Sequence, residues 1–383
     1  MLNILLKTEI IFHKYLYFLY FIYQVFKDLK KCYKYMPSSK EYKIIGKGSY
    51  SIVITPPIEN VLKSQWFINY DNKQDDDVSK VYKINDLEDF EAELFILSEI
   101  TEIENYEEFT VCLKGASNFY LDEIQDENIL KELEVQKCGL NQIEMQQIIF
   151  GYGGISIHKY DKHFSFDHSF NLLLNFYKGL LKINSCNIIH RDIKPTNVLY
   201  NGEKLLIIDF GLSCHIDDVY NWIKSDFILS NKYPFNPPEF FVYYLLKKNN
   251  ILKCDDIDFF LFNMNEPGSS IRQEIVKYYD KHWLQFHNEE YDISKYYNGI
   301  RGICNSIMVH KNIQDFFTSF LAKKTDVYAS FYIINVMKSK TQFNSEKEEK
   351  LYTDLYEMSS VFNPENRCNI EDIIELMESF NRL

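Results

Sequence analysis

The hydrophobic and polar positions along the chain predict strands first and helices afterwards. Residues 42–58 contain two β-branched runs joined by a glycine-containing turn, a pattern typical of a β-hairpin. Short apolar runs predict further strands at residues 80–84 and 146–150. Between these two runs, apolar residues at helical spacing predict a helix over residues 87–100. The first part of the chain is therefore expected to be rich in strands.

The later part of the pattern is mainly helical. Residues 170–184 show helical spacing, and short apolar runs at 186–189 and 204–208 are typical of strands. From about residue 240 onward the sequence is mostly helical. Strands that precede helices, with a glycine-rich hinge at residues 151–154, predict an α+β chain of two lobes.

Composition and charge narrow the class of protein. With 46% hydrophobic and 25% charged residues, the 383-residue chain has globular values, which exclude wholesale disorder. The net charge of −13 makes it a poor binder of nucleic acid, because phosphate affinity comes from clustered lysine and arginine. The eight cysteines are scattered without a C-x-x-C motif, which fits neither a zinc site nor a disulfide scaffold. We therefore expect a cytoplasmic, reducing compartment and no nucleic-acid partner.

Residues 1–35 form an aromatic and basic leader. Its apolar stretch, residues 15–26, is about half the length of a membrane span. The leader holds six lysines against two acidic residues. A helix packed onto the following domain is the preferred interpretation. Contact with a membrane surface and a translation start at Met36 are the alternatives.

Two short motifs carry the chemistry. The first is HRDIKPTN at residues 190–197, which follows a predicted strand, and the second is DFG at residues 209–211. In this order and spacing the chain resembles the eukaryotic-type protein kinase family, with its H-R-D-x-x-x-x-N and D-F-G loops. The resemblance implies a bilobal fold with a small β-rich N-lobe and a larger, mainly helical C-lobe. The wording YGGIS at 152–156 also resembles kinases of large DNA viruses, which would place the chain in a host cell cytoplasm.

The resemblance implies ATP and Mg2+ as cofactors and a serine or threonine hydroxyl of a protein as acceptor. Asp192 would accept or orient the proton of that hydroxyl, and Lys194 would lie near the transferring phosphate. Asn197 and Asp209 would present oxygen ligands to magnesium. The Lys194-Pro195 pair resembles serine/threonine kinases. Lys232, seven residues before Glu239, departs from the threonine that the serine/threonine family generally has there.

A nucleotide site is implied upstream of these motifs, in a loop that resembles G-x-G-x-x-G-x-V with Ser51 in place of the third glycine. Lys83 is preferred over Lys80 as the strand lysine that neutralises the α- and β-phosphates. Glu93 is preferred over Glu91 as its partner on the following helix. The expected nucleotide-binding positions are Ile45, Gly46, Lys47, Gly48, Ser49, Tyr50, Ser51, Ile52, Val53 and Lys83.

Three later motifs extend the resemblance. PPE at 237–239 stands in for A-P-E, DVYASF at 326–331 for D-V-W-S-x-G, and NPENR at 363–367 for D-P-x-x-R. They imply that Asp326 braces the catalytic loop and that Arg367 forms a buried ion pair with Glu239. Most family members have a short loop where this chain has many residues, so an insertion is predicted at about 241–322.

The implied organisation is a leader at 1–35 and a kinase domain at 40–383. Within the domain we expect an N-lobe at about 40–150, the hinge at 151–154 and a C-lobe at 155–383. The oligomeric state is not predicted. The alternatives are a pseudokinase scaffold that binds nucleotide or partners without turnover, and a phosphotransferase for small molecules.

Two weaker signals complete the prediction. Three serines of the activation segment, residues 209–239, are candidate phosphorylation sites that would pair with Arg191. Three histidines recur every five residues, which is not a zinc-binding interval, so no metal role is expected for them. The serines are Ser213, Ser225 and Ser230, and the histidines are His158, His163 and His168.

Overall fold

The computed structural model describes residues 42–48, 50–58, 76–83, 87–121, 124, 126–133, 143–219, 237–251, 253, 256–266, 268–278, 293–310 and 312–381. The leader, Ser49, Ser225, Ser230 and Lys232 lie outside these residues. The chain divides into two compact units, and each is described by itself. The first unit holds the described residues up to Leu94 together with Leu113–Tyr152. The second holds Phe95–Cys112 and the chain from Gly153 onward.

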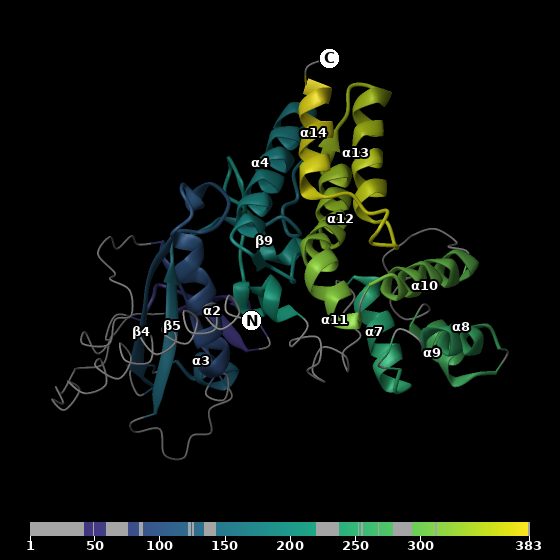
Figure 1. Ribbon diagram of the computed structural model, residues 1–383. Coiled ribbons are helices and arrows are strands. Elements are labelled where there is room, and N and C mark those ends of the chain that lie inside the picture. Colours follow the sequence, from purple (N-terminus) through teal and green to yellow (C-terminus); the bar gives the residue numbers. More distant parts are fainter. Residues whose placement is uncertain are drawn as a thin grey trace, which may run out of the picture. The chain divides into compact units, whose positions relative to one another are not determined.

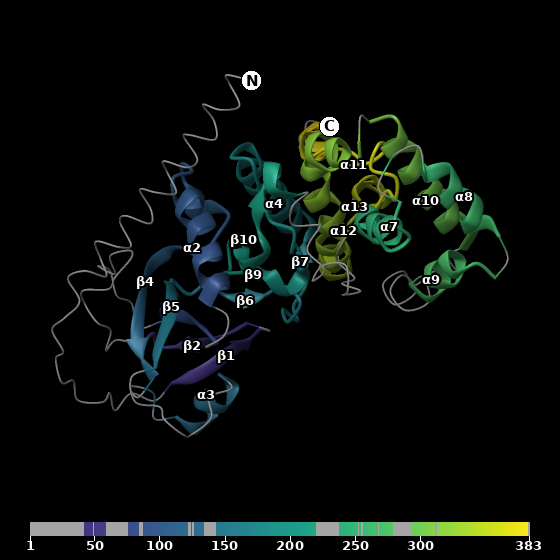
Figure 2. The same cartoon turned by 60° about the horizontal axis from the view of Figure 1, so that its bottom comes forward.

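A five-stranded antiparallel sheet forms the first unit, with strand order β1-β2-β3-β5-β4. Figure 2 shows β1 and β2 side by side, and their antiparallel pairing confirms the predicted hairpin. The strand predicted at 80–84 begins two residues earlier than expected and ends at Tyr82. The five strands are β1 (Lys43–Lys47), β2 (Ser51–Thr55), β3 (Val78–Tyr82), β4 (Leu113–Tyr120) and β5 (Glu144–Phe150).

One face of this sheet forms the core of the first unit. Ile52, Val81 and Phe119 belong to a single buried cluster that also holds Ile129 of helix α3 (Glu127–Glu132). The side chain of Gln147 lies within the sheet and bonds both backbone groups of Ile58, which holds the chain after β2 against β5. Helix α2 (Leu87–Thr101) matches the predicted helix, and its residues up to Leu94 belong to this unit.

Helices dominate the second unit, as predicted for the chain from residue 240 onward. In Figure 1, α4, α12, α13 and α14 lie side by side, and they pack against one another. None of the described helices is long and apolar enough to cross a membrane. The helices are α4 (Phe166–Ser185), α7 (Pro238–Lys248), α8 (Ile257–Asn265), α9 (Ser270–Tyr278), α10 (Ile293–Met308), α11 (Ile313–Asp315), α12 (Ala322–Lys340), α13 (Glu346–Ser359) and α14 (Ile370–Asn381).

Short strands and short helices lie between the long helices of the second unit. The strands pair in three small sheets, β10-β9-β6, β11-β8 and β12-β7. They are β6 (Ile155–Ser156), β7 (Phe164–Ser165), β8 (Ile188–Ile189), β9 (Val198–Tyr200), β10 (Leu205–Ile207), β11 (Cys214–His215) and β12 (Thr341–Gln342). The short helices are η2 (Tyr106–Glu108), η4 (Pro195–Asn197), η5 (Phe210–Leu212), η6 (Ile216–Asp218) and the π-helical η9 (Phe316–Leu321).

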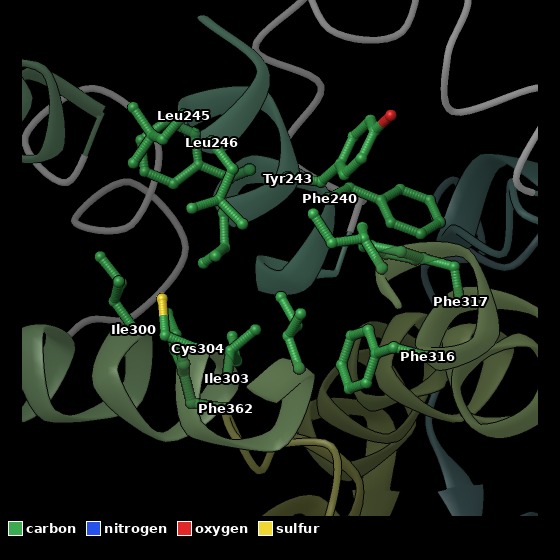
Figure 3. Close-up of a cluster of buried hydrophobic side chains, with 14 of the residues drawn as sticks. Phe240, Tyr243, Leu245, Leu246, Ile300, Ile303, Cys304, Phe316, Phe317 and Phe362 are labelled. Atoms are coloured by element: carbon green, nitrogen blue, oxygen red, sulfur yellow. The ribbon is translucent and has the colours of Figure 1, made fainter. Parts of the chain in front are cut away.

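The helices of the predicted insertion share one hydrophobic core with the rest of the second unit. Figure 3 shows Phe240 and Leu246 of α7 facing Ile303 of α10, with Phe316 and Phe362 in the same cluster. Because α7, α10 and the segment after α13 all contribute to it, residues 241–322 do not form a core of their own in the described part of the chain.

Residues 95–112 group with the second unit, although the sequence placed them in the N-lobe. The reason is a set of close contacts between this segment and later parts of the chain. Phe109 packs so closely on α4 that a Cβ on Gly179 would lie 2.2 Å from its Cβ. The hydroxyl of Thr110 donates to the carbonyl of Ile207 at 2.6 Å. Glu99, near the end of α2, lies 2.5 Å from His215 of β11.

Candidate active site

The loop between β8 and β9 is held by a buried carboxylate from α12. Asp326 accepts the backbone N–H groups of His190 and Arg191, both at 2.8 Å, and its side chain is fully buried. This confirms the predicted brace. Arg191 adopts φ +65°, in the left-handed region that costs energy for a residue with a side chain. The two hydrogen bonds to Asp326 therefore hold a strained turn in place.

Two polar side chains of this loop converge on one carboxylate oxygen of a third residue, Asp192. Oδ2 of Asp192 accepts from Nζ of Lys194 at 2.9 Å and from Nδ2 of Asn197 at 2.7 Å. Asp192 and Asn197 are both buried, and Lys194 is partly exposed. Charge-assisted bonds of this kind fix the orientation of a carboxylate. The structure thus brings together three of the residues that the sequence singled out.

The oxygen donors expected for magnesium fit that ion. Asn197 directs its amide nitrogen to the carbonyl and the carboxylate of Asp192, which leaves its side-chain oxygen as the acceptor atom. Its backbone carbonyl accepts from the N–H of Ile208, which ties the loop to the segment just before Asp209. The described residues hold no group of three His, Cys, Asp or Glu side chains suited to a metal. Magnesium takes only one or two protein oxygens beside phosphate and water, and the side-chain oxygens of Asn197 and Asp209 are of the chemical kind that it prefers.

His190 and Phe210 pack together behind the loop. Their ring centroids lie 4.8 Å apart, and both side chains are buried. The N–H of Asp192 donates to Nδ1 of His190, so Nδ1 is an acceptor and the Nε2 proton points to the carbonyl of Ile208 at 3.0 Å. His190 had no predicted role of its own, and its side chain supports the backbone at Asp192 through these contacts.

Arg191 is buried beside a thiol. Its Nη1 donates to Sγ of Cys214 at 3.4 Å, and loss of hydration lowers the pKa of Arg191 to about 10. Burial also raises the pKa of the Cys214 thiol. Ser213, a candidate phosphorylation site, donates its hydroxyl to the carbonyl of His190 at 3.2 Å.

In the first unit, Glu93 is paired with Lys80, the lysine that the sequence prediction placed second to Lys83. Nζ of Lys80 lies 2.6 Å from Oε2 of Glu93, and the hydroxyl of Tyr82 donates to the same oxygen at 2.6 Å. Glu93 is buried as expected, and Glu91 is exposed. Lys83 follows the end of β3, which stops at Tyr82.

Strand register shows which face of the sheet Lys80 occupies. Residues paired directly across a sheet point to the same face. Gly46 pairs with Val53, Val53 with Lys80, and Lys80 with Ile148, so these four positions form one row across the sheet. Lys80 therefore shares its face with the loop that resembles a nucleotide-binding loop. Lys83 lies one residue beyond the end of β3, where its N–H donates to the carbonyl of Tyr50 at 2.9 Å, so it is not part of this row.

The loop itself is a tight hairpin. The N–H of Gly48 donates to the carbonyl of Ser51 at 2.8 Å, and a Cβ on Gly48 would lie 3.3 Å from that oxygen. Ile52 is buried in the core of the first unit, so its side chain serves packing, and the side chain of Val53 lies on the opposite face. Of the remaining expected positions, Ile45 is exposed and Lys47 pairs with Glu132 at 2.7 Å.

The ion pair predicted between Glu239 and Arg367 is confirmed. Nη1 of Arg367 lies 2.8 Å from Oε1 of Glu239, and Nη2 lies 3.0 Å from Oε2, with both side chains fully buried. Arg367 also donates to the carbonyls of Val361, Lys324 and Phe362. This fork-to-fork geometry anchors the start of α7.

Two supporting residues were missed by the sequence analysis. The sequence predicted no role for Tyr82, and its hydroxyl bond to Glu93 depends on the fold. Asn184 donates to Oδ2 of Asp326 and to the carbonyl of Ile188, which joins α4 to the catalytic loop. A polar residue at a buried position of a helix was the one signal that pointed to it.

The three spaced histidines lie in the second unit. His168 contacts the hydroxyl of Tyr200 through Nε2 at 2.9 Å, on the first turn of α4. His158 and His163 are exposed residues of the loops before α4.

A sheet-rich unit with a paired lysine and glutamate, and a helical unit in which Asp326 braces the loop at Asp192, together resemble the architecture of a protein kinase domain. Residues 120–251 match the family model described as "Protein kinase domain". The fold is α+β, with a strand-rich first unit and a mainly helical second unit.

Curated relatives agree with this class. Mitogen-activated protein kinase 14 of Xenopus laevis is 36% identical over 77 residues, which cover 18% of this chain and 21% of that protein. Cell division cycle 7-related protein kinase of Homo sapiens is 43% identical over 51 residues, 13% of this chain and 9% of that protein. A probable serine/threonine-protein kinase of Encephalitozoon cuniculi is 42% identical over 52 residues, 14% and 10% respectively. The aligned segments span about a fifth or less of these relatives, and they support a eukaryotic-type protein kinase domain.

Proposed function

We propose that this protein is an ATP-dependent serine/threonine protein kinase. The observation that carries the proposal is the carboxylate of Asp192, which Lys194 and Asn197 orient and whose loop Asp326 braces. Phosphoryl transfer depends mainly on positioning and charge, and a fixed carboxylate beside a lysine supplies both.

Asp192 is the group that accepts or orients the proton of the acceptor hydroxyl. Lys194 is held within hydrogen-bond distance of Asp192, so its positive charge stays at the place where the phosphoryl group would pass. Asn197 fixes the carboxylate through its amide nitrogen and keeps its oxygen for a cation. These three residues belong to one short loop, and hydrogen bonds within that loop set their relative geometry.

Asn197 and Asp209 would hold Mg2+, which supplies charge neutralisation at the phosphates of ATP. In the first unit, we assign Lys80 to the α- and β-phosphates in place of Lys83. Glu93 keeps the Lys80 ammonium in one position, because a buried carboxylate pairs strongly with it. The loop from Gly46 to Val53 would contact the nucleotide through its backbone.

A protein hydroxyl is the proposed acceptor. The Lys194-Pro195 pair and the probable serine/threonine-protein kinase among the similar proteins support serine or threonine. A reducing compartment is proposed as well, because the five cysteines in the described part of the chain are free thiols. They are Cys112, Cys186, Cys214, Cys304 and Cys368. The likeness to kinases of large DNA viruses stays a prediction.

The proposal is tested by incubating the full chain with labelled ATP, magnesium and mixed basic and acidic protein substrates. Asp192→Asn should lower the transfer rate by about 10²–10⁴-fold, the usual contribution of a positioned acid–base group. Asp161→Asn, an exposed aspartate of the same unit, is the matched control and should leave the rate within about twofold.

Two further readouts separate the alternatives. Phosphoamino-acid analysis of the product should give phosphoserine or phosphothreonine. If wild type and Asp192→Asn transfer label equally poorly while ATP still raises the unfolding temperature of both, the chain is a pseudokinase and the proposal is wrong.

A further inference from the structure

Helix α8 presents large apolar side chains on two opposite faces. One face, formed by Ile257, Phe260 and Met264, is fully buried in the core of the second unit. On the other side, Phe259 is 67% exposed and Phe262 is 64% exposed. These two rings are three residues apart, so they lie on neighbouring positions of the helix surface.

The exposed rings are not needed to hold α8 in the fold. The helix packs against α9 and α10, as Figure 1 shows. Its last residue, Asn265, accepts from Arg301 of α10 and from Arg272 of α9, both at 3.2 Å. An amphipathic surface helix needs one apolar stripe, and α8 already buries one. Two adjacent exposed phenylalanines on an anchored helix therefore indicate a surface built for contact.

Acidic residues surround the two rings. Asp258 and Glu266 are exposed and lie four residues before and after Phe262, which places all three on the same side of the helix. Asp256, at the start of α8, is also exposed. From Asp258 to Glu266, the residue that follows the end of α8, there are eight residue steps, over which a helix rises roughly 12 Å. The surface is thus an aromatic pair with a negative charge at each end.

We propose that this face of α8 docks a basic, amphipathic segment of a partner protein. Apolar side chains of the segment pack on Phe259 and Phe262, and its lysine or arginine side chains meet Asp258 and Glu266. The negative rim excludes an anionic membrane and nucleic acid, whose phosphates it would repel. It also disfavours a second copy of this chain, since an isologous contact would place the same carboxylates opposite each other.

The inference is independent of phosphoryl transfer, because docking needs no turnover. Its test is fluorescence anisotropy with the full chain and a labelled helical peptide of about 18 residues, with leucine on one face and lysine on the other. A peptide of the same composition in an order that has no apolar face is the probe control. Measurements at about 0.15 M salt suppress nonspecific attraction to the acidic chain.

The Phe259→Ser/Phe262→Ser double variant should weaken binding of the amphipathic peptide by about tenfold or more, a loss of about 1.4 kcal/mol. Val309→Ser removes an apolar side chain that is 77% exposed elsewhere and should change the Kd by less than about twofold. Asp258→Lys/Glu266→Lys should weaken the lysine peptide and strengthen a glutamate version of it. Circular dichroism and thermal unfolding check that each variant folds, as expected for substitutions at exposed positions.

Three results would overturn the proposal. In the first, the amphipathic and control peptides bind wild type equally, or the double serine variant binds as wild type does. In the second, wild type sediments as a dimer that the double serine variant loses, which assigns the face to a second copy. In the third, vesicles of phosphatidylcholine and phosphatidylserine bind wild type through these two rings, which assigns it to a lipid surface.

Discussion

The carboxylate of Glu93 is buried with two donors on one oxygen. Lys80 and Tyr82 both lie 2.6 Å from Oε2, and Glu93 is 1% exposed. A buried carboxylate that loses its cation keeps its desolvation cost, so removing Lys80 is expected to affect both stability and nucleotide binding. The residue that provides this cation is therefore decisive for the proposed activity.

Replacing each candidate lysine by methionine distinguishes them. Lys80→Met should lower phosphoryl transfer by about 10²-fold or more, the size found when one preorganised charge is removed. Lys83→Met deletes the same charge three residues later and serves as the matched control, with an expected change of less than about threefold. Steady-state rates with labelled ATP and thermal unfolding of both variants provide the measurement. If Lys83→Met loses phosphoryl transfer while Lys80→Met stays active, Lys83 is the lysine that binds the phosphates, as the sequence predicted.

At the scale of residues, the motifs predicted which side chains belong to the candidate site. Strand register then showed which face of the sheet Lys80 occupies. Asp192, Lys194 and Asn197 were predicted from one contiguous motif. Because they are close together in sequence, the local backbone alone brings their side chains within hydrogen-bond distance. Lys80 and Lys83 were both candidates from the sequence, and the facing of each depends on the bounds of β3, which the sequence pattern predicted two residues too late. The bond from Tyr82 to Glu93 joins a strand to a helix, so it follows from packing that no local pattern encodes.

At the scale of elements, periodicity predicted the helices and local capping set their ends. Apolar spacing predicted a helix at 170–184, and α4 begins earlier because Ser165 caps it, its hydroxyl accepting the N–H of His168. The sequence also predicted that the inserted residues are helical. It gave no sign of how closely they pack, which depends on Gly299 of α10. A Cβ there would lie 2.3 Å from Cδ1 of Phe362.

Gly299→Ala is expected to destabilise the protein, although alanine favours helices. The new methyl group must displace Phe362, a member of the core cluster whose carbonyl accepts from Arg367. Overpacking of this kind costs about 1–3 kcal/mol, more than the ~1 kcal/mol that alanine gains over glycine in a helix. Asn298→Ala, at the neighbouring exposed position of α10, is the control and should be neutral or slightly stabilising. Denaturant unfolding measures both, and a Gly299→Ala variant as stable as wild type would contradict the close packing.

At the scale of the whole second unit, one arginine joins segments that are far apart in sequence. Arg367 pairs with Glu239, which precedes the insertion, and donates to the carbonyl of Lys324, which follows it. Nζ of Lys324 in turn donates to the carbonyls of Pro364 and Arg367. The two ends of the insertion therefore lie close together, since Arg367 contacts a residue just before it and a residue just after it. Kinase-like motifs predicted the Arg367–Glu239 pair, but the closure through Lys324 required knowing where the inserted helices end.

A double-mutant cycle on this pair measures how strongly the closure holds. Arg367→Met or Glu239→Leu alone should each cost about 3–5 kcal/mol, because each leaves the other charge buried and unpaired. The double variant should be more stable than the sum of the single losses predicts, with a coupling of about 1–3 kcal/mol. It should stay below wild type, since the carbonyls of Val361, Lys324 and Phe362 lose their donor.

The control cycle uses a surface ion pair of the same unit. Lys178 and Glu378 lie 2.8 Å apart with side chains 47% and 40% exposed. Their coupling should be no more than about 1 kcal/mol, because water screens exposed charges. Urea unfolding of all variants gives both couplings under the same conditions. Equal coupling energies for the two pairs would mean that the Arg367–Glu239 pair does not hold the ends of the insertion together. A larger coupling energy for Arg367–Glu239 would show that the inserted helices stabilise the unit that carries Asp192 through this contact.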